Sequence, residues 1–546
     1  MRKRKILFIN PSCSTDFLNS SVVNAAMGKT CFFPSLSLMT IAALTPKDRF
    51  DVELFDEYLG KTVEEVAPQA DLYALTCYDP NRDRAHEICR WLKAQGKTVV
   101  LGGPHATHHH AAIASAEPYD ALFAGDAELT WPRFLDEWER GTHQRIYLES
   151  TKVDLAHTPV ARWDLCDADK YLTAVMQTSR GCPFSCEFCD AIILYGNHVR
   201  VKPIETVMAE LEIIYRRGFQ SVLIGDDNFT AKRKYAKDLL RRIAAWREDK
   251  DPLFVLGAQL SIDVARDDEL LALMARAGLV FAYVGIESSN KEALKGANKL
   301  HNLRSDMRAD VEKIHSYGIS VMSGLIVGFD EDGPEIFNRH VEFCRELALP
   351  VCNTYLLSAP YGTPLRARLE KEGRVTANFA LGELLTSNIV PKQMTSGELI
   401  GGFRWMTTQL FDPDGFAERL DRKFAVFRTR STGPAGKMSW AIRRKHYALA
   451  ARIFRYTVTH HQAARELAGL LRRALPTMIK RPAFINDIFQ DLMIFIRFKR
   501  YYEQMGAYRE ELRHAGPPET WTRARRVAAS RERAREERTE AVAQEQ

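Results

Sequence analysis

Short apolar runs alternate with helix-like stretches along this 546-residue chain from Lys5 to about Leu369. In residues 1–145, one such stretch, Arg82–Gln95, places Ala85, Ile88 and Leu92 on a single face. Alternation of this kind predicts an α/β fold with a parallel, doubly wound, Rossmann-like sheet, which binds its ligands at the carboxyl ends of the strands. The expected strands are Lys5–Ile9, Asp51–Phe55, Leu72–Thr76, Val99–Leu101 and Ala121–Ala124.

A second alternation occupies residues 171–375, after a polar connector at residues 146–170. Six β/α repeats predict a partial (β/α)6 barrel, and the active site of such a barrel lies at the C-terminal ends of its strands. The expected strands are Thr173–Thr178, Ser221–Gly225, Phe254–Leu260, Phe281–Ile286, Ser320–Val327 and Asn353–Leu357.

The strand pattern stops near residue 376. Residues 376–515 are predicted to form a mainly helical extension that is rich in basic and aromatic side chains. Residues 516–546 are rich in Arg, Glu and Ala and contain almost no large apolar side chain, a composition typical of a charged, disordered tail.

Composition excludes several classes of protein. Lys and Arg total 76 against 70 Asp and Glu, so the net charge of +6 is slight for this length and does not indicate nucleic-acid binding. No apolar run approaches about 18 residues, so no membrane span is predicted. The first apolar run ends at Asn10-Pro11, too early for a secretory signal, and ten cysteines do not suggest a disulfide framework here. A cytoplasmic protein is expected.

Three cysteines crowd into eight residues directly after the first strand of the second alternation. Cys182, Cys186 and Cys189 have the spacing Cys-x3-Cys-x2-Cys. Three thiolates on one loop can hold three corners of a cubane iron–sulfur cluster and leave the fourth iron open to a small molecule. The alternative is zinc, which would need a fourth ligand nearby, such as Asp190 or His198.

The order Cys-x3-Cys-x-aromatic-Cys after the first strand of a β/α barrel resembles the radical S-adenosylmethionine (SAM) superfamily over about residues 170–370. The resemblance implies that Cys182, Cys186 and Cys189 hold a [4Fe–4S] cluster. SAM would bind the open iron through its amino and carboxylate groups and be cleaved reductively to methionine and a 5′-deoxyadenosyl radical. Phe188 stands at the family's aromatic position beside the adenine.

The same resemblance implies further SAM contacts at other strand ends. Asp226 and Asp227 follow the second strand, where carboxylates suit the ammonium group of SAM. An Asx turn that caps the next helix is the alternative interpretation of this pair. Glu287 either contacts SAM or substrate, or forms a structural ion pair. The other implied SAM contacts are Gln259, Ser261 and Ile326.

Residues 1–145 resemble the cobalamin-binding domains that are fused to radical SAM barrels, through Pro34–Leu38, Ile41–Leu44, Gly102–Thr107 and Gly125–Glu128. Strand-end glycines would make room for the corrin and its nucleotide tail. The Asp-x-His-x-x-Gly motif is absent, so we expect cobalamin without a histidine ligand to cobalt; a degenerate domain that binds no cobalamin is the alternative. The implied cobalamin contacts are Cys77, Tyr78, Gly102, Gly103, Pro104, His105, Gly125 and Asp126.

Two other features have competing interpretations. The run His108–His110 suggests a metal site, but a solvated surface is expected there. The basic, aromatic stretches Trp440–Thr457 and Ile485–Met505 either cap the barrel or present an amphipathic basic face, which could lie on an anionic membrane or cover an apolar substrate.

The C-terminal part resembles the hopanoid C-2 methylase-like group through Gly328–Asp330, Ala359–Leu365 and Leu369–Arg374. This group implies a cobalamin-dependent C-methyltransferase that uses methylcobalamin and a 5′-deoxyadenosyl radical on an unactivated carbon. The implied partners are a small-molecule substrate, lipid-like or a secondary metabolite, and a reductant such as flavodoxin or ferredoxin, with peripheral membrane contact and no nucleic acid. The alternatives are a ring-forming or oxidative radical SAM enzyme, a non-catalytic SAM or cobalamin sensor, and a zinc-dependent nucleic-acid protein.

Overall fold

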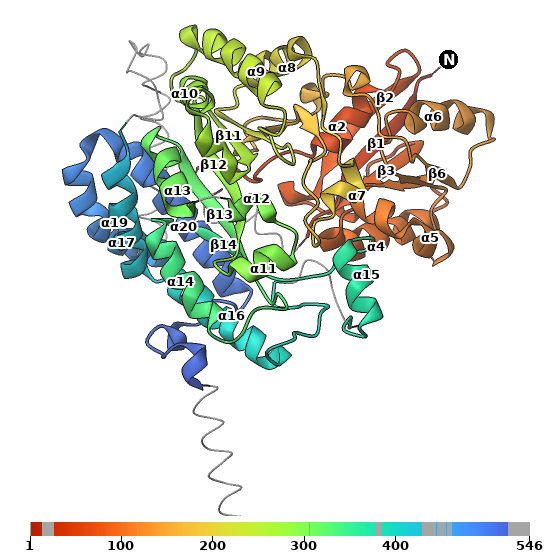
Figure 1. The fold of residues 1–546 in the computed structure, drawn as a ribbon. Helices are drawn as coiled ribbons and strands as arrows, with labels where there is room; N and C mark the ends of the chain where they lie inside the picture. Colours follow the sequence, from red (N-terminus) through yellow and green to blue (C-terminus); the bar gives the residue numbers. More distant parts are fainter. Residues whose placement is uncertain are drawn as a thin grey trace, which may run out of the picture.

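The computed structural model describes residues 2–13, 24, 27–116, 118–304, 306–376, 384–428, 444, 455 and 461–521. Within these residues the chain forms two six-stranded parallel sheets and a set of C-terminal helices. Figure 1 shows the first sheet in red and orange on one side of the molecule and the second in yellow and green beside it. The predicted α/β class, with a helical C-terminal part, is confirmed.

The first sheet has the strand order β2-β1-β3-β4-β5-β6. Helices cover both faces of this sheet, so the side chains of a central strand are buried on both faces, as all five residues of β3 show. The strands are β1 (Arg4–Asn10), β2 (Phe50–Asp56), β3 (Leu72–Thr76), β4 (Val99–Gly102), β5 (Ala121–Ala124) and β6 (Ile146–Leu148). The sixth strand was not predicted, and it lies in the segment expected to be a connector.

Each face of the first sheet has its own apolar layer. One layer packs under α4 (Arg82–Ala94) and α5 (Pro104–Ala116), and the other packs under α2 (Leu36–Ala43) and α6 (Thr130–Arg140). A short helix, α3 (Val63–Val66), follows β2. The sheet is therefore doubly wound.

The second sheet has the order β14-β13-β12-β11-β10-β7, with every pair of neighbours parallel. The strands are β7 (Ala174–Met176), β10 (Ser221–Ile224), β11 (Val255–Leu260), β12 (Leu279–Glu287), β13 (Ser320–Val327) and β14 (Cys352–Leu356). These are the six strands that the sequence predicts, with small shifts at their ends. They agree with a partial (β/α)6 barrel.

Five of the described helices cover one face of the second sheet. On β12, Ala282, Val284 and Ile286 face this helical layer and are buried, while Tyr283 and Glu287 alternate with them on the inner face. The covering helices are α8 (Ile204–Arg216), α9 (Arg233–Trp246), α10 (Asp268–Arg276), α13 (Met307–Ser316) and α14 (Ile336–Glu346). Shorter elements are the antiparallel ribbon β8 (Ser179–Arg180) and β9 (Arg200–Val201), α7 (Ala191–Tyr195), α11 (Lys291–Gly296), α12 (Leu300–Leu303) and α15 (Pro364–Lys371).

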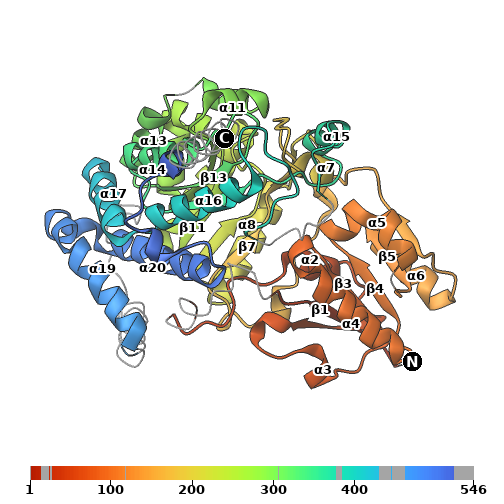
Figure 2. The ribbon, with the colours of Figure 1, turned by 90° about the horizontal axis from the view of Figure 1, so that it is seen from below.

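The C-terminal helices share one hydrophobic core with the second sheet. They are α16 (Ser396–Leu410), α17 (Pro413–Val426), α19 (His461–Lys480) and α20 (Ile485–Gln504), and Figure 2 shows them against the barrel. Phe495 and Phe498 of α20 are buried, and the backbone N–H of Thr354 in β14 donates to Tyr502 Oη at 2.9 Å. The aromatic side of α20 therefore caps the barrel.

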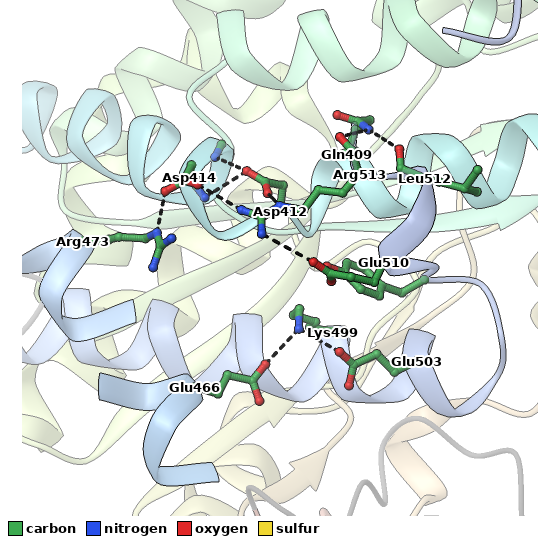
Figure 3. Close-up of polar contacts among 12 residues, drawn as sticks. Gln409, Asp412, Asp414, Glu466, Arg473, Lys499, Glu503, Glu510, Leu512 and Arg513 are labelled. Atoms are coloured by element: carbon green, nitrogen blue, oxygen red, sulfur yellow. Dashed lines mark hydrogen bonds and ion pairs between the residues drawn. The ribbon is translucent and has the colours of Figure 1, made fainter. Parts of the chain in front are cut away.

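The charges of this extension pair with one another, as Figure 3 shows. Lys499 Nζ lies 3.1 Å from Glu466 Oε1 and 2.7 Å from Glu503 Oε1, and Arg473 Nε lies 2.5 Å from Asp414 Oδ1. This pairing supports the interpretation of α20 as a cap. The predicted stretch Trp440–Thr457 and most of the predicted tail lie outside the described residues. Among the described helices, none combines the length and apolarity needed to cross a bilayer.

Candidate active site at the seam between two sheets

The three cysteines lie on the loop that follows the short strand β8. Cys186 is buried, and Cys182 and Cys189 are half-buried. The loop leaves β8 through Gly181, whose φ of +98° favours glycine; a Cβ there would lie 2.5 Å from the carbonyl oxygen of His198. The N–H of Glu187 donates to Ala297 O at 2.9 Å, so a backbone contact fixes the loop against the end of α11.

Burial raises the pKa of all three thiols, and it raises that of Cys189 to about 12. The thiols are therefore protonated until a metal displaces the protons. The ammonium of Lys299 opposes this effect at Cys186 and supplies positive charge beside the thiolates that a cluster needs. The loop thus provides three sulfur ligands in a site that is shielded from solvent.

The spacing of the sulfurs bears on which metal the loop suits. Among the described residues, the groups of three ligating side chains with donor atoms within 4.8 Å of one another do not include the three cysteines. A tetrahedral zinc with Zn–S bonds of about 2.3 Å would bring its sulfurs to about 3.8 Å from one another. A cubane places its thiolates on separate irons and holds them farther apart. The donor set fits a cluster better than zinc.

Asp226 and Asp227 hold the cluster loop in place. Asp226 is 1% exposed, and its carboxylate accepts hydrogen bonds from Thr178 N at 2.6 Å and from Ser179 Oγ at 2.7 Å. Asp227 Oδ2 accepts from Gly181 N at 2.8 Å, and burial raises the pKa of Asp227 to about 6. Both carboxylates bind the segment that leads into the cysteines. Their predicted contact with SAM stays a prediction.

Glu287 forms a half-buried ion pair with Lys299, at 2.8 Å between Oε1 and Nζ. Its φ of +68° is unusual for a residue with a side chain. A Cβ on Gly285 would lie 2.5 Å from Glu287 Oε1 and 3.0 Å from Lys299 Nζ, so the glycine makes room for the pair. The structure thus contains the ion pair that the sequence offers as one interpretation of Glu287.

The remaining predicted SAM contacts lie on or next to the inner face of the barrel. Gln259 is exposed on β11, and Ser261 is buried and accepts a hydrogen bond from Asn228 Nδ2 at 2.8 Å. Phe188 packs edge-on against Phe329 at 5.9 Å, and Ile326 packs against the same apolar cluster. A small cavity of about 160 Å³ opens beside Phe188 and Phe329. As SAM contacts, these residues stay predictions.

A larger cavity, of about 340 Å³, lies at the carboxyl ends of β3, β4 and β5 on the α2/α6 face of the first sheet. Its volume is near the lower end of the range for ligand sites, so it could take a part of cobalamin such as the nucleotide tail. The barrel closes it from the other side with Arg180, Tyr195, Lys202 and Gly225. The predicted cobalamin residues that line it are Gly102, Gly103, Pro104, Gly125 and Asp126.

Two glycines on the wall of this cavity permit close backbone approaches. Gly103 has φ +109°, and a Cβ there would lie 2.5 Å from Cys77 O. Gly125 has φ +92°, and a Cβ there would lie 2.1 Å from Glu149 O. Because the neighbouring atoms are backbone, neither position tolerates a side chain without movement of a strand end.

A buried group of charges, which the sequence did not reveal, joins this cavity to the cluster loop. Arg180 lies 2.7 Å from Glu128 and 3.2 Å from Asp126, and Arg200 lies 3.0 Å from Asp126. Arg180 and Arg200 come from the β8–β9 ribbon, which leads into and out of the cysteine loop. No local pattern marks these arginines, because their partners lie 54 and 74 residues away.

Cys77, Tyr78 and His105, also predicted to contact cobalamin, do not line this cavity. His105 is buried, and its Nδ1 lies 2.5 Å from Asp79 Oδ1. Cys77 is fully buried, and Tyr78 Oη lies 2.8 Å from Tyr58 Oη. Their contact with cobalamin stays a prediction.

The expectation of a solvated surface at His108–His110 is wrong for His108 and His109. Their side chains are 5% and 16% exposed. His108 Nε2 lies 3.5 Å from Asp190 Oδ2, and the ring of His109 meets that of Tyr361 at 4.6 Å. Both partners belong to the barrel part of the chain, so docking of the first sheet against the barrel buries these histidines.

Comparisons with known proteins agree with this arrangement. Residues 176–344 match the model of the radical SAM superfamily, and residues 363–514 match a domain of unknown function, DUF4070. An uncharacterized methyltransferase of Synechocystis sp. is 31% identical over 78% of this chain and 78% of its own length. Hopanoid C-2 methylase of Rhodopseudomonas palustris is 30% identical over 72% of this chain and 74% of its own.

Among solved structures, the cobalamin-dependent SAM radical enzyme OxsB, with aqua-cobalamin and SAM bound, superposes with a TM-score of 0.59. The match covers 95% of this chain and 84% of OxsB at 14% identity, which shows a common fold. The fold, the DUF4070 match and the two relatives at 30% identity or more all indicate the same family. The chain belongs to the cobalamin-binding radical SAM methyltransferase family.

Proposed function

We propose that this protein binds a [4Fe–4S] cluster, SAM and cobalamin, and methylates an unactivated carbon of a hydrophobic small molecule. The observation that carries the proposal is the seam between the two sheets. There, the cavity framed by Gly103 and Gly125 is closed by Arg180, which stands two residues before Cys182. One site therefore adjoins both predicted cofactors.

When bound, the cluster supplies the electron that cleaves SAM, and cobalamin supplies the methyl group. The chain's own residues hold these groups in place. Cys182, Cys186 and Cys189 provide the iron ligands, and the carboxylates of Asp226 and Asp227 fix the backbone that leads into them. Burial of Cys186 shields this part of the loop from water.

The charges of the seam orient the two sites relative to each other. Asp126, at the carboxyl end of the first sheet, accepts from Arg180 and Arg200 of the ribbon that carries the cysteine loop. These ion pairs are buried on both sides, so they fix geometry better than exposed pairs would. We infer that they hold the cobalamin side against the cluster side at a constant distance.

The proposed substrate class rests on the relatives. Hopanoid C-2 methylase acts on a lipid, as its name states, and it aligns with most of this chain. We propose a lipid-like or secondary-metabolite substrate that reaches the inner face of the barrel. The reductant we propose is a flavodoxin or a ferredoxin. Because such a substrate partitions into membranes, we also propose peripheral contact with a membrane by an otherwise cytoplasmic protein.

The experiment follows the methyl group. The full chain is reconstituted anaerobically with iron, sulfide and hydroxocobalamin, and is then given SAM labelled in its methyl group together with a reductant. The proposal predicts label in the cobalamin fraction, 5′-deoxyadenosine, and labelled methyl in a lipid extract. 5′-Deoxyadenosine without labelled cobalamin would support a radical reaction without methyl transfer. SAM that binds but is never cleaved would support a sensor. Either result contradicts the methylase.

A further inference from the structure

A second group of metal-ligating side chains lies outside the cysteine loop, on the α4/α5 face of the first sheet. Asp79 follows β3, and His105 and His109 lie one turn apart at the start of α5. One donor atom from each of the three residues lies within 4.8 Å of the other two. All three are buried or half-buried.

The distances centre on one carboxylate oxygen. Asp79 Oδ1 lies 2.5 Å from His105 Nδ1 and 3.8 Å from His109 Nε2. A hydrogen bond between Asp79 and His105 would account for two of the three residues. His109 turns a ring nitrogen toward the same oxygen from the next turn of the helix, at a distance too long for a hydrogen bond. A cation bound by all three side chains would replace this hydrogen bond and move Asp79 Oδ1 and His105 Nδ1 to about 3 Å from each other.

Aromatic rings contact this group on several sides. The ring of His105 meets the rings of His86 and His109 at 5.6 and 4.7 Å, and Cys77, His86 and His105 also have donor atoms within 4.8 Å of one another. Tyr361, from the segment before α15, covers His109. Both parts of the chain therefore contribute to the surroundings of this group, and none of its three residues lines the cavity on the α2/α6 face.

We propose that Asp79, His105 and His109 bind a divalent first-row transition-metal ion, separate from the iron–sulfur cluster. Two imidazoles and one carboxylate are donors that suit Zn²⁺ and Fe²⁺, and a carboxylate offsets part of the charge in a buried site. Such an ion would join the loop after β3 to the first turns of α5. Through His109 and Tyr361 it would stiffen the contact between the first sheet and the barrel.

Zinc is the probe for the test. The anaerobic protein, with its cluster in place so that Cys182, Cys186 and Cys189 are occupied, is dialysed to equilibrium against Zn²⁺, and bound zinc is counted by mass spectrometry. We expect about one zinc per chain. Asp79→Asn and His109→Ala should each weaken binding by at least about tenfold. His110→Ala is the matched control, because His110 Nδ1 lies 3.1 Å from Thr107 O and outside the group.

No retained zinc, or equal retention by the Asp79→Asn and His109→Ala variants, would overturn the proposal. Iron content and circular dichroism show whether a variant folds. If a variant does not fold, X-ray absorption at the zinc edge of the unaltered protein decides. Imidazole and carboxylate ligands at about 2.0–2.2 Å support the site, and sulfur ligands overturn it. The test needs no cobalamin and no substrate, so it stands apart from the proposed methylation.

Discussion

The two sheets have the same number of strands and the same parallel direction, yet they use their carboxyl ends differently. In the first sheet, the edge that borders the cavity carries glycines with positive φ, and backbone comes close to backbone. In the second sheet, the same edge carries thiols, carboxylates and a lysine. At the cavity, the glycines of the first edge make space for a ligand beside Asp126, whereas the second edge lies next to the three sulfur ligands.

Strand order explains part of this difference. In the first sheet, β1 lies between β2 and β3, so the chain reverses direction across the sheet and helices cover both faces. A crevice is expected where the order reverses, between β1 and β3, and the cavity lies next to this point, at the carboxyl ends of β3, β4 and β5. In the second sheet the strands follow one another in sequence order, and the described helices α8, α9, α10, α13 and α14 cover one face. The comparison predicts that each edge can be damaged without damage to the other.

The largest effect is expected at the second edge. Cys186→Ala should abolish the cluster and reduce 5′-deoxyadenosine formation to background, because a cubane with two protein thiolates is held too weakly. Iron content and 5′-deoxyadenosine from SAM measure the effect. The control is Cys89→Ala, which changes a buried thiol of α4. Full activity of Cys186→Ala would show that the cysteine loop is not the reaction site.

The next largest effect, a loss of stability, is expected when the ion pairs of Asp126 with Arg180 and Arg200 are removed. Asp126→Ala leaves Arg200 buried with its cation unpaired, so the free energy of unfolding should fall by about 3–5 kcal/mol. Chemical denaturation measures the loss. Arg308→Ala is the control: its pair with Glu312 is exposed, and no measurable change is expected. If the two variants are equally stable, the seam does not depend on these ion pairs.

A smaller effect is expected at the first edge. Gly103→Ala should cost about 2–4 kcal/mol of stability and weaken cobalamin binding, because φ is +109° and the new Cβ would meet Cys77 O at 2.5 Å. Equilibrium binding of hydroxocobalamin measures it. Gly60→Ala is the control for backbone strain. Gly60 has φ +97°, but a Cβ there would have no atom within 4 Å, so this variant adds strain without a steric clash. The result that contradicts this account is equal cobalamin affinity in the two variants.

The smallest effect concerns a buried carboxyl near the second edge. Asp332, behind β13, accepts from the backbone N–H groups of Gly328 and Phe329, and burial raises its pKa to about 7. The folded chain therefore holds this proton more tightly than the unfolded chain, and the stability it contributes at low pH is lost as the pH rises from about 4 to about 7.

Asp332→Asn cannot ionise and keeps an oxygen acceptor. Its melting temperature relative to the unaltered chain should therefore rise across that window of pH and stay level above it. Asp56→Asn is the matched change at the first sheet. Burial raises the pKa of Asp56 to about 6, so the same rise in relative melting temperature should end near pH 6 instead of pH 7. If the difference in melting temperature between variant and unaltered chain does not change with pH, the pKa values of these two carboxyl groups are not raised by burial.

The sequence predicts those parts of the fold that depend on local burial. Eleven of the twelve strands in the two sheets are apolar enough to be recognised, whereas β6 shows only Tyr147 buried between two exposed residues. The cysteine loop could be predicted because its chemistry lies in its spacing. The pairing of Asp126 with Arg180 and Arg200, and the burial of His108, depend on how the two sheets dock, and no short stretch of sequence contains that information.

The most direct test of the account counts both cofactors in the same three proteins. Iron and cobalamin are measured after anaerobic reconstitution of the unaltered chain, Cys186→Ala and Gly103→Ala. We expect about four irons and one cobalamin in the unaltered chain. We expect cobalamin without iron in Cys186→Ala, and iron with reduced cobalamin in Gly103→Ala. The claim that each sheet binds its own cofactor would be contradicted if either variant lost both cofactors. It would also be contradicted if the unaltered chain bound no cobalamin.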